Sequence, residues 1–66
     1  MKSILLNGEN HSTASATVLN LLQELDVPAR GVAVAINGEV VRRAEHANRV
    51  LKEGDRVEVI RAVQGG

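Results

Sequence analysis

Along this chain, apolar residues alternate with small or polar residues in several short stretches and recur at helical spacing in one longer stretch. Alternation is typical of strands that bury one face, and a spacing of three to four residues is typical of an amphipathic helix. The pattern predicts an α+β fold, with one helix over residues 16–25 packed across one face of a mixed sheet of about five strands. We expect the strands at residues 2–6, 11–15, 32–36, 39–41 and 56–63.

The predicted helix carries its apolar residues on one side. Val18, Leu22 and Leu25 recur at i, i+4 and i+7, and the apolar face is widened by Leu19 and Leu21. The hydroxyl of Ser15 or Thr17 can accept a hydrogen bond from a free N–H group of the first turn, so either residue can cap the helix. Pro28 disfavours a helical conformation at the residue before it, so we expect the helix to end ahead of this proline.

Asparagine–glycine pairs mark two of the predicted turns. Asn37-Gly38 lies between two apolar runs, and an Asn-Gly pair flanked in this way is a strong hairpin signal. Asn7-Gly8 ends the first strand with the same turn chemistry. After the second hairpin, residues 42–52 are mostly polar. We interpret them as a crossover that contains a short helical turn and leads to the last strand.

The composition narrows the classes of function. The chain has no Phe, Trp or Tyr, and its eight basic and eight acidic side chains cancel. Binders of single-stranded nucleic acid stack bases on aromatic rings, and nucleic-acid binders in general are basic, so this class is disfavoured. Without cysteine the chain forms no disulfide. No apolar run approaches the ~20 residues that span a bilayer, and we expect a soluble cytoplasmic protein.

The side chains do not indicate a catalytic or metal site. His11 and His46 stand apart from any cluster of metal-ligating residues, and we expect both to be exposed. The hydroxyl residues of segment 12–17 have no neighbouring base that would mark a nucleophile, so we interpret them as strand and capping residues. The crossover is basic through Arg42, Arg43 and Arg49. Such a stretch is either a solvated face or a surface that meets an acidic partner.

Some apolar residues are expected on the side of the sheet that the helix leaves open. If Val57 and Val59 face the helix, alternation turns the other apolar residues of the last strand away from it. The same reasoning applied to the first and middle strands completes a patch of Leu5, Ala33, Ala35, Ile60 and Ala62. Contiguous exposed apolar surface often marks a protein contact, so we predict a partner surface here. The alternative is that these are the scattered exposed apolar residues that any protein has.

The sequence ends in Gln64-Gly65-Gly66, and we interpret residues 64–66 as a thin tail on a domain of residues 1–63. An α-carboxylate has a pKa of roughly 3.5, so it is ionised at neutral pH and is a poor electrophile until it is joined to a good leaving group. Two residues without side chains let a narrow channel of a partner enzyme close around the backbone. On the glycines alone, a frayed chain end is the alternative interpretation.

Three segments together resemble one known family. They are AINGEVV at residues 35–41, LKEGDRVEVI at residues 51–60 and the terminal Gly65-Gly66. Over essentially the whole chain they resemble the ThiS family of sulfur carrier proteins, which have the ubiquitin-like β-grasp fold. The chain departs from the expected family pattern at Arg42, where proline is frequent, and at His46, where an aromatic residue is frequent. Neither residue belongs to the tail.

The resemblance implies a function for Gly66. A ubiquitin-activating-like adenylyltransferase would use ATP and Mg²⁺ to adenylate its carboxylate, and sulfur from cysteine, brought by a sulfur donor enzyme, would displace AMP. Thiazole synthase would then use the thiocarboxylate as sulfur donor for the thiazole of thiamine. The chain itself would be a protein substrate, not an enzyme, and would bind no cofactor. Two alternatives stay open: the small subunit of molybdopterin synthase, and a ubiquitin-like modifier or binding module.

Overall fold

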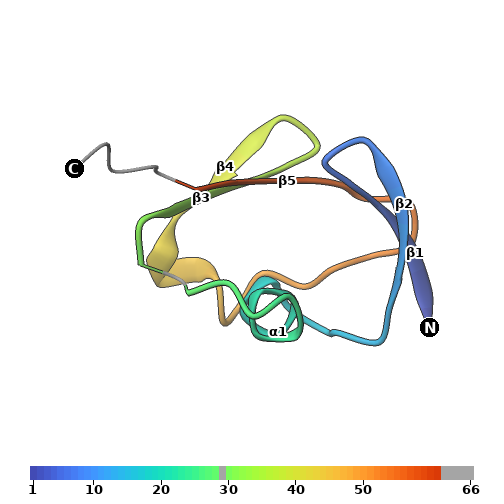
Figure 1. The fold of residues 1–66 in the computed structure, drawn as a ribbon, viewed down its shortest axis with the longest axis horizontal. Coiled ribbons are helices and arrows are strands. Elements are labelled where there is room, and N and C mark those ends of the chain that lie inside the picture. The colour runs from blue at the N-terminus through green and yellow to red at the C-terminus, as the bar shows by residue number, and fades with distance from the viewer. Residues whose placement is uncertain (29, 62–66) are drawn as a thin grey trace.

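Five strands and one α-helix make up the part of the chain that the structure, a computed structural model, describes: residues 1–28 and 30–61 (Figure 1). The strands form one mixed sheet in the order β2-β1-β5-β3-β4, and α1 lies across one side of it. The predicted α+β fold with a mixed five-stranded sheet is confirmed. The bounds of the elements are β1 Lys2–Leu6, β2 Glu9–Thr13, α1 Val18–Glu24, β3 Val32–Ile36, β4 Glu39–Val41 and β5 Arg56–Arg61.

β5 is the central strand of the sheet. It runs parallel to β1, with which it pairs along Leu5 and Leu6, and antiparallel to the whole of β3. β1 and β3 each begin a hairpin, so β2 and β4 take the two edges. The last strand in the sequence is therefore enclosed by both hairpins.

Both hairpins turn through the predicted asparagine–glycine pairs. The φ angles are 51° at Asn7, 85° at Gly8, 53° at Asn37 and 84° at Gly38. Left-handed conformations at both central residues fit a two-residue type I′ turn, which matches the twist of the flanking strands. Such a turn pairs Leu6 directly with Glu9, so β2 begins at Glu9. The predicted return strand at 11–15 was therefore two residues too late.

The helix begins after Thr17, whose hydroxyl accepts a hydrogen bond from the N–H group of Asn20 at 3.2 Å. Thr17 is thus the cap that the structure uses, and the hydroxyl of Ser15 instead donates to Glu24. The helix starts later than predicted because Thr17 is bridged to Val50 of the crossover. The helical side chains that are completely buried are Val18, Leu21 and Leu22.

The core lies between α1 and the sheet and contains only aliphatic residues. It consists of Ile4, Val18, Leu21, Leu22, Val34, Ile36, Val41, Leu51 and Val57. The predicted helical turn of the crossover is a 3₁₀ helix, Arg43–Glu45, and the following segment places Leu51 in the core. The crossover therefore contributes to the core as well as connecting β4 to β5.

His46 is buried, with 2% of its surface exposed, and the prediction that it is exposed was wrong. The crossover folds over the start of α1: the N–H of Leu19 donates to the carbonyl of His46 at 2.8 Å, and that of Val18 to the carbonyl of Arg49 at 3.0 Å. The ring Nε2 lies 3.2 Å from the carbonyl oxygen of Val41, and because a carbonyl only accepts, Nε2 carries the proton. The imidazole is thus the one ring buried among the described residues.

Candidate functional site

The predicted tail begins shortly after β5 ends. Gln64, Gly65 and Gly66, together with Ala62 of the predicted patch, lie outside the described residues. The last described residue, Arg61, pairs with Val32 of β3. In sequence, the tail therefore follows almost directly on the central strand of the sheet.

The exposed side of the sheet carries the described part of the predicted patch. Along β5, Val57 is buried and Val59 is half-buried against the core, whereas Ile60 is 61% exposed. Ile60 pairs with Ala33, which is also exposed. Leu5 and Ala35 are half-buried, and alternation along their strands turns them to the same side. The structure thus places the four described residues of the patch on the side of the sheet away from α1.

Val40 belongs to the same side of the sheet and was missed by the sequence analysis. It is 75% exposed and pairs with Ala35 across the β3–β4 hairpin. The pairing of β3 with β4 would have revealed the outward direction of Val40, because residues directly opposite each other in an antiparallel pair point to the same face. Val41, the next residue, is buried in the core, so alternation along β4 turns Val40 outward.

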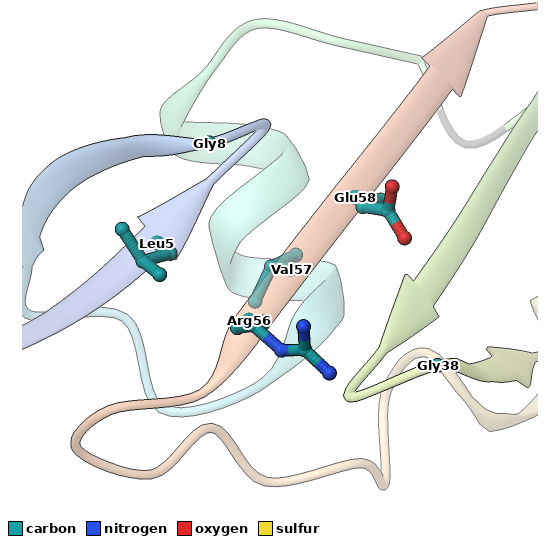
Figure 2. A pocket seen from close by; sticks show the side chains of 6 residues that line it. All are labelled: Leu5, Gly8, Gly38, Arg56, Val57 and Glu58. Carbon is teal, nitrogen blue, oxygen red and sulfur yellow. The ribbon is translucent and has the colours of Figure 1, made fainter.

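A surface hollow of about 360 Å³ lies next to these residues, where β5 starts between the two asparagine–glycine turns. Figure 2 shows Leu5 and the charged side chains of Arg56 and Glu58 around it, with the turn glycines on either side. Its lining consists of Leu5, Gly8, Gly38, Arg56, Val57 and Glu58. The lining combines apolar surface from Leu5 with the opposite charges of Arg56 and Glu58.

A cluster around Glu24 joins β2 to the end of α1. The hydroxyls of Thr13 and Ser15 both donate to Oε1 of Glu24, and Nε2 of His11 donates to Oε2 at 2.7 Å. These hydrogen bonds, that from Thr13 first, lower the pKa of Glu24 below its usual value. His11 is therefore half-buried rather than exposed, contrary to the prediction.

The Glu24 cluster contains a serine, a histidine and a carboxylate but is not arranged as a catalytic triad. In a triad the histidine lies between the other two groups, with one ring nitrogen bonded to the nucleophile and the other to the carboxylate. Here Ser15, Thr13 and His11 all bind the same carboxylate. The cluster fixes the helix to the first hairpin, which agrees with the interpretation of the hydroxyl residues as structural.

The basic crossover is mostly solvated. Arg42 and Arg43 are exposed, and Nη1 of Arg49 lies 3.8 Å from Oε1 of Glu39 on β4. Within residues 1–28 and 30–61, no three His, Asp or Glu side chains are grouped so as to hold a metal ion. Over the same ranges, no helix is long and apolar enough to cross a membrane.

Comparisons with a family model and with individual proteins point to the same family. The sequence model of the ThiS family matches residues 4–66. The sulfur carrier protein ThiS of Thermus thermophilus is 41% identical over 61 residues, which cover 92% of this chain and 95% of that protein. The protein of the same name from Escherichia coli is 36% identical over 53 residues, or 80% of either chain. A thiazole synthase of Paramagnetospirillum magneticum is 38% identical over all 66 residues, which make up 20% of its length.

Solved structures agree with the sequence relatives. The crystal structure of the thiamine biosynthesis protein ThiS from Geobacter metallireducens superposes with a TM-score of 0.82 at 34% identity, covering 97% of this chain and 99% of that one. Its solution NMR structure gives a TM-score of 0.80. The sheet order and the helix across one face are thus those of the ubiquitin-like β-grasp fold. With the fold and the sequence in agreement over nearly its whole length, the chain belongs to the ThiS family.

Proposed function

We propose that this chain is a sulfur carrier protein of thiamine biosynthesis that carries sulfur as a thiocarboxylate on Gly66. The observation that carries the proposal is the family match, which continues through Gly65 to residue 66. The relatives from T. thermophilus and E. coli are named sulfur carrier proteins, and both match most of the chain.

The chemistry at Gly66 needs an activated carboxylate. A carboxylate oxygen attacks the α-phosphorus of ATP, and pyrophosphate leaves to give the acyl-adenylate. A sulfur nucleophile then attacks the carbonyl carbon, and AMP leaves; with hydrosulfide as that nucleophile, the products are the thiocarboxylate, AMP and a proton. A ubiquitin-activating-like adenylyltransferase supplies the site for ATP and Mg²⁺, and a sulfur donor enzyme supplies the sulfur. The carrier is the substrate of both steps.

We assign the ATP site to the partner, because residues 1–28 and 30–61 contain no glycine-rich loop of the kind that holds phosphates. Phosphate-binding loops gather several glycines in one turn that opens a helix. Here the glycines of residues 1–61 stand singly in four turns, at Gly8, Gly31, Gly38 and Gly54. The tail, residues 64–66, spans at most ~10 Å when fully extended, so the body of the domain has to dock close to the activating site.

The exposed side of the sheet is the surface that we propose for this docking. Ile60 and Ala33 face each other there, and Leu5 and Ala35 lie on the neighbouring strands. In sequence, Ala62 follows this surface toward the tail, so a partner that covers Ile60 also lies close to the start of the segment it has to receive. A few residues that become desolvated near the centre of an interface supply most of its affinity.

The relative from P. magneticum supports thiazole synthase as the consumer of the sulfur. That protein is named thiazole synthase, and a fifth of its length resembles this entire chain. A carrier-like segment within one polypeptide with such an enzyme is kept near it at a high effective concentration. We propose that this chain delivers its thiocarboxylate to a separate thiazole synthase.

The test is to incubate the protein with ATP, Mg²⁺ and the candidate adenylyltransferases of its genome and to measure its intact mass. An AMP adduct, followed after addition of sulfide by replacement of one oxygen with sulfur, supports the proposal. The matched control lacks Gly66 and should fold normally without forming the adduct. Adducts formed only with a molybdopterin-pathway enzyme, or conjugates to lysines of other proteins, would instead assign the chain to one of the two alternative functions.

A further inference from the structure

Asn7 binds the last strand in addition to turning the first hairpin. Its backbone N–H donates to the carbonyl of Val57 at 2.9 Å, and its side-chain Oδ1 accepts from the backbone N–H of Val59 at 2.9 Å. Its Nδ2 lies 3.4 Å from the carbonyl oxygen of Val59. An asparagine side chain has the acceptor and donor of a peptide group. The Asn7 side chain therefore takes the place of a further β1 residue in the pairing with β5, although β1 has ended at Leu6.

This contact is the last one that the first hairpin makes with β5. On the side facing β1, the carbonyls of Asp55 and Val57 accept hydrogen bonds from the backbone, and Val59 is bound by the Asn7 side chain instead. Among the described residues, no further group of β1 or β2 bonds to β5 after Val59. On the opposite side, β3 continues to pair as far as Arg61. The end of β5 is thus held by a full strand on one side and by one side chain on the other.

We propose that Asn7 is a positioning residue for the reaction at Gly66. By binding Val59, Asn7 holds the end of β5 in its place in the sheet as far as Arg61, and the sequence continues from there to Gly66. The proposal rests on the proposed function, because it concerns the delivery of the Gly66 carboxylate to an activating site. Misplacing a reacting group by about 1 Å can cost up to ~10²-fold in rate, even when the change lies far from the chemistry.

Asn37 offers a matched control in the second hairpin. It has the same neighbour, glycine, and nearly the same φ, 53° against 51°. Its Oδ1 also accepts from a β5 backbone N–H at 2.9 Å, but that of Arg56, at the beginning of the strand. Gly8 and Gly38 line the same hollow, so both turns border the same part of the surface. The two asparagines differ in which end of β5 they hold and in the partner of Nδ2, which for Asn37 is Oδ1 of Asp55 at 3.1 Å.

The experiment compares Asn7→Gly, Asn37→Gly and Asn7→Asp with the native protein. Glycine accepts the left-handed backbone and removes only the side-chain contact. Aspartate tolerates this backbone and keeps the oxygen that accepts from Val59. The activating reaction with the cognate adenylyltransferase is followed by pyrophosphate release while the carrier is titrated, which separates kcat from KM. Amide hydrogen exchange at Val59 and Arg56, measured by NMR, reports on the two contacts directly.

For Asn7→Gly we expect faster exchange at Val59 and a fall in kcat of about fivefold or more, with KM within about twofold of native. Asn7→Asp should restore most of kcat. Asn37→Gly should speed exchange at Arg56 and leave kcat near the native value. An equal loss of kcat in both glycine variants would reveal a general loss of order, and it would overturn the positioning role.

The exchange measurement separates the two proposals. If Val59 exchanges at the native rate in Asn7→Gly, the side-chain contact does not hold β5, and the positioning role fails whatever the kinetics show. If the native protein is adenylated and Asn7→Gly retains full kcat, the positioning role alone fails. If no adenylyltransferase acts on the native protein, the proposed function itself fails, and the positioning role with it.

Discussion

Ile60→Asp tests whether the exposed side of the sheet binds a partner. Ile60 lies on the central strand, and its neighbour in sequence, Val59, packs against the core. A charge at residue 60 should therefore disturb the outer surface and leave the inner one intact. Val57→Asp, three residues earlier on the same strand, places the same charge on the inner side and is the matched comparison.

The burial of each residue sets the loss of stability that we expect in Ile60→Asp and in Val57→Asp. Ile60 is 61% exposed, so roughly two fifths of its surface is buried. Complete burial of an isoleucine is worth ~1.5–3 kcal/mol, so the loss of this share costs about 0.6–1.2 kcal/mol. The poor strand propensity of aspartate adds up to about 1 kcal/mol. A domain of this length has ~3–10 kcal/mol of stability, so Ile60→Asp stays folded.

Val57→Asp should behave differently, because Val57 is completely buried between the sheet and α1. An uncompensated buried charge costs about 3–5 kcal/mol, which is comparable to the entire stability of the domain. Urea unfolding followed by far-UV circular dichroism measures both variants, since a chain without aromatic residues has no useful intrinsic fluorescence. Calorimetric titration of folded Ile60→Asp with the adenylyltransferase should show at least about tenfold weaker binding, as expected for a central apolar anchor.

Two results would refute the reasoning. If Ile60→Asp lost as much stability as Val57→Asp, the inside and outside of β5 would be misassigned. If Ile60→Asp were folded and bound the adenylyltransferase with native affinity, the exposed side of the sheet would not be the docking surface. Ile60→Ala serves as the control for the added charge, because it removes the anchor without introducing repulsion.

Three further predictions address the helix, its attachment and the tail. The hydrogen bonds that lower the pKa of Glu24, led by that from Thr13, stabilise the fold fully above its usual pKa of 4.5. This stability is lost as the pH falls from there through the lower folded-state pKa. Glu24→Gln should flatten this acid-side loss in urea titrations; an unchanged pH profile would contradict it. Leu21→Ala should cost about 2–5 kcal/mol, seen as a lower urea midpoint, and a loss below ~1 kcal/mol would mean that Leu21 lies outside the core. Gly65→Leu should slow adenylation by about tenfold or more while Tm stays within ~2 °C, because the added side chain would not fit a channel shaped for bare backbone. A large loss of Tm together with the slower adenylation would count against such a channel.

The elements that could be predicted from sequence are those that depend on neighbouring residues. The hairpin at Asn37-Gly38 follows from turn chemistry that needs no tertiary contact, and the predicted strands on either side of it were confirmed. The same chemistry at Asn7-Gly8 predicts a two-residue turn, and such a turn places the start of β2 at Glu9, where the structure has it. The helix was located by its apolar spacing, but its first residue depends on the bridge between Thr17 and Val50, which are far apart in sequence.

The burial of His46 and the binding of Val59 by Asn7 could not be predicted in this way. His46 lies in a polar stretch, and it becomes buried only because the crossover packs over the first turn of α1. Asn7 and Val59 are 52 residues apart, and their contact exists only because β1 and β5 are parallel neighbours. The patch was largely foreseeable because alternation is local, whereas Val40 required the register of β3 with β4.

The position of β5 in the sheet connects the fold to the proposed function. A reactive chain end attached to an edge strand could peel away from the domain when a partner draws it into a channel. Here the strand before the tail is central, is paired on both sides and contributes Val57 to the core. Separating it would break the pairing with β1 and with β3 and would expose the aliphatic core, which is most of what holds so small a domain together. A partner that draws in the residues after β5 would therefore act on the folded domain as a whole, because the strand that precedes them is paired on both sides.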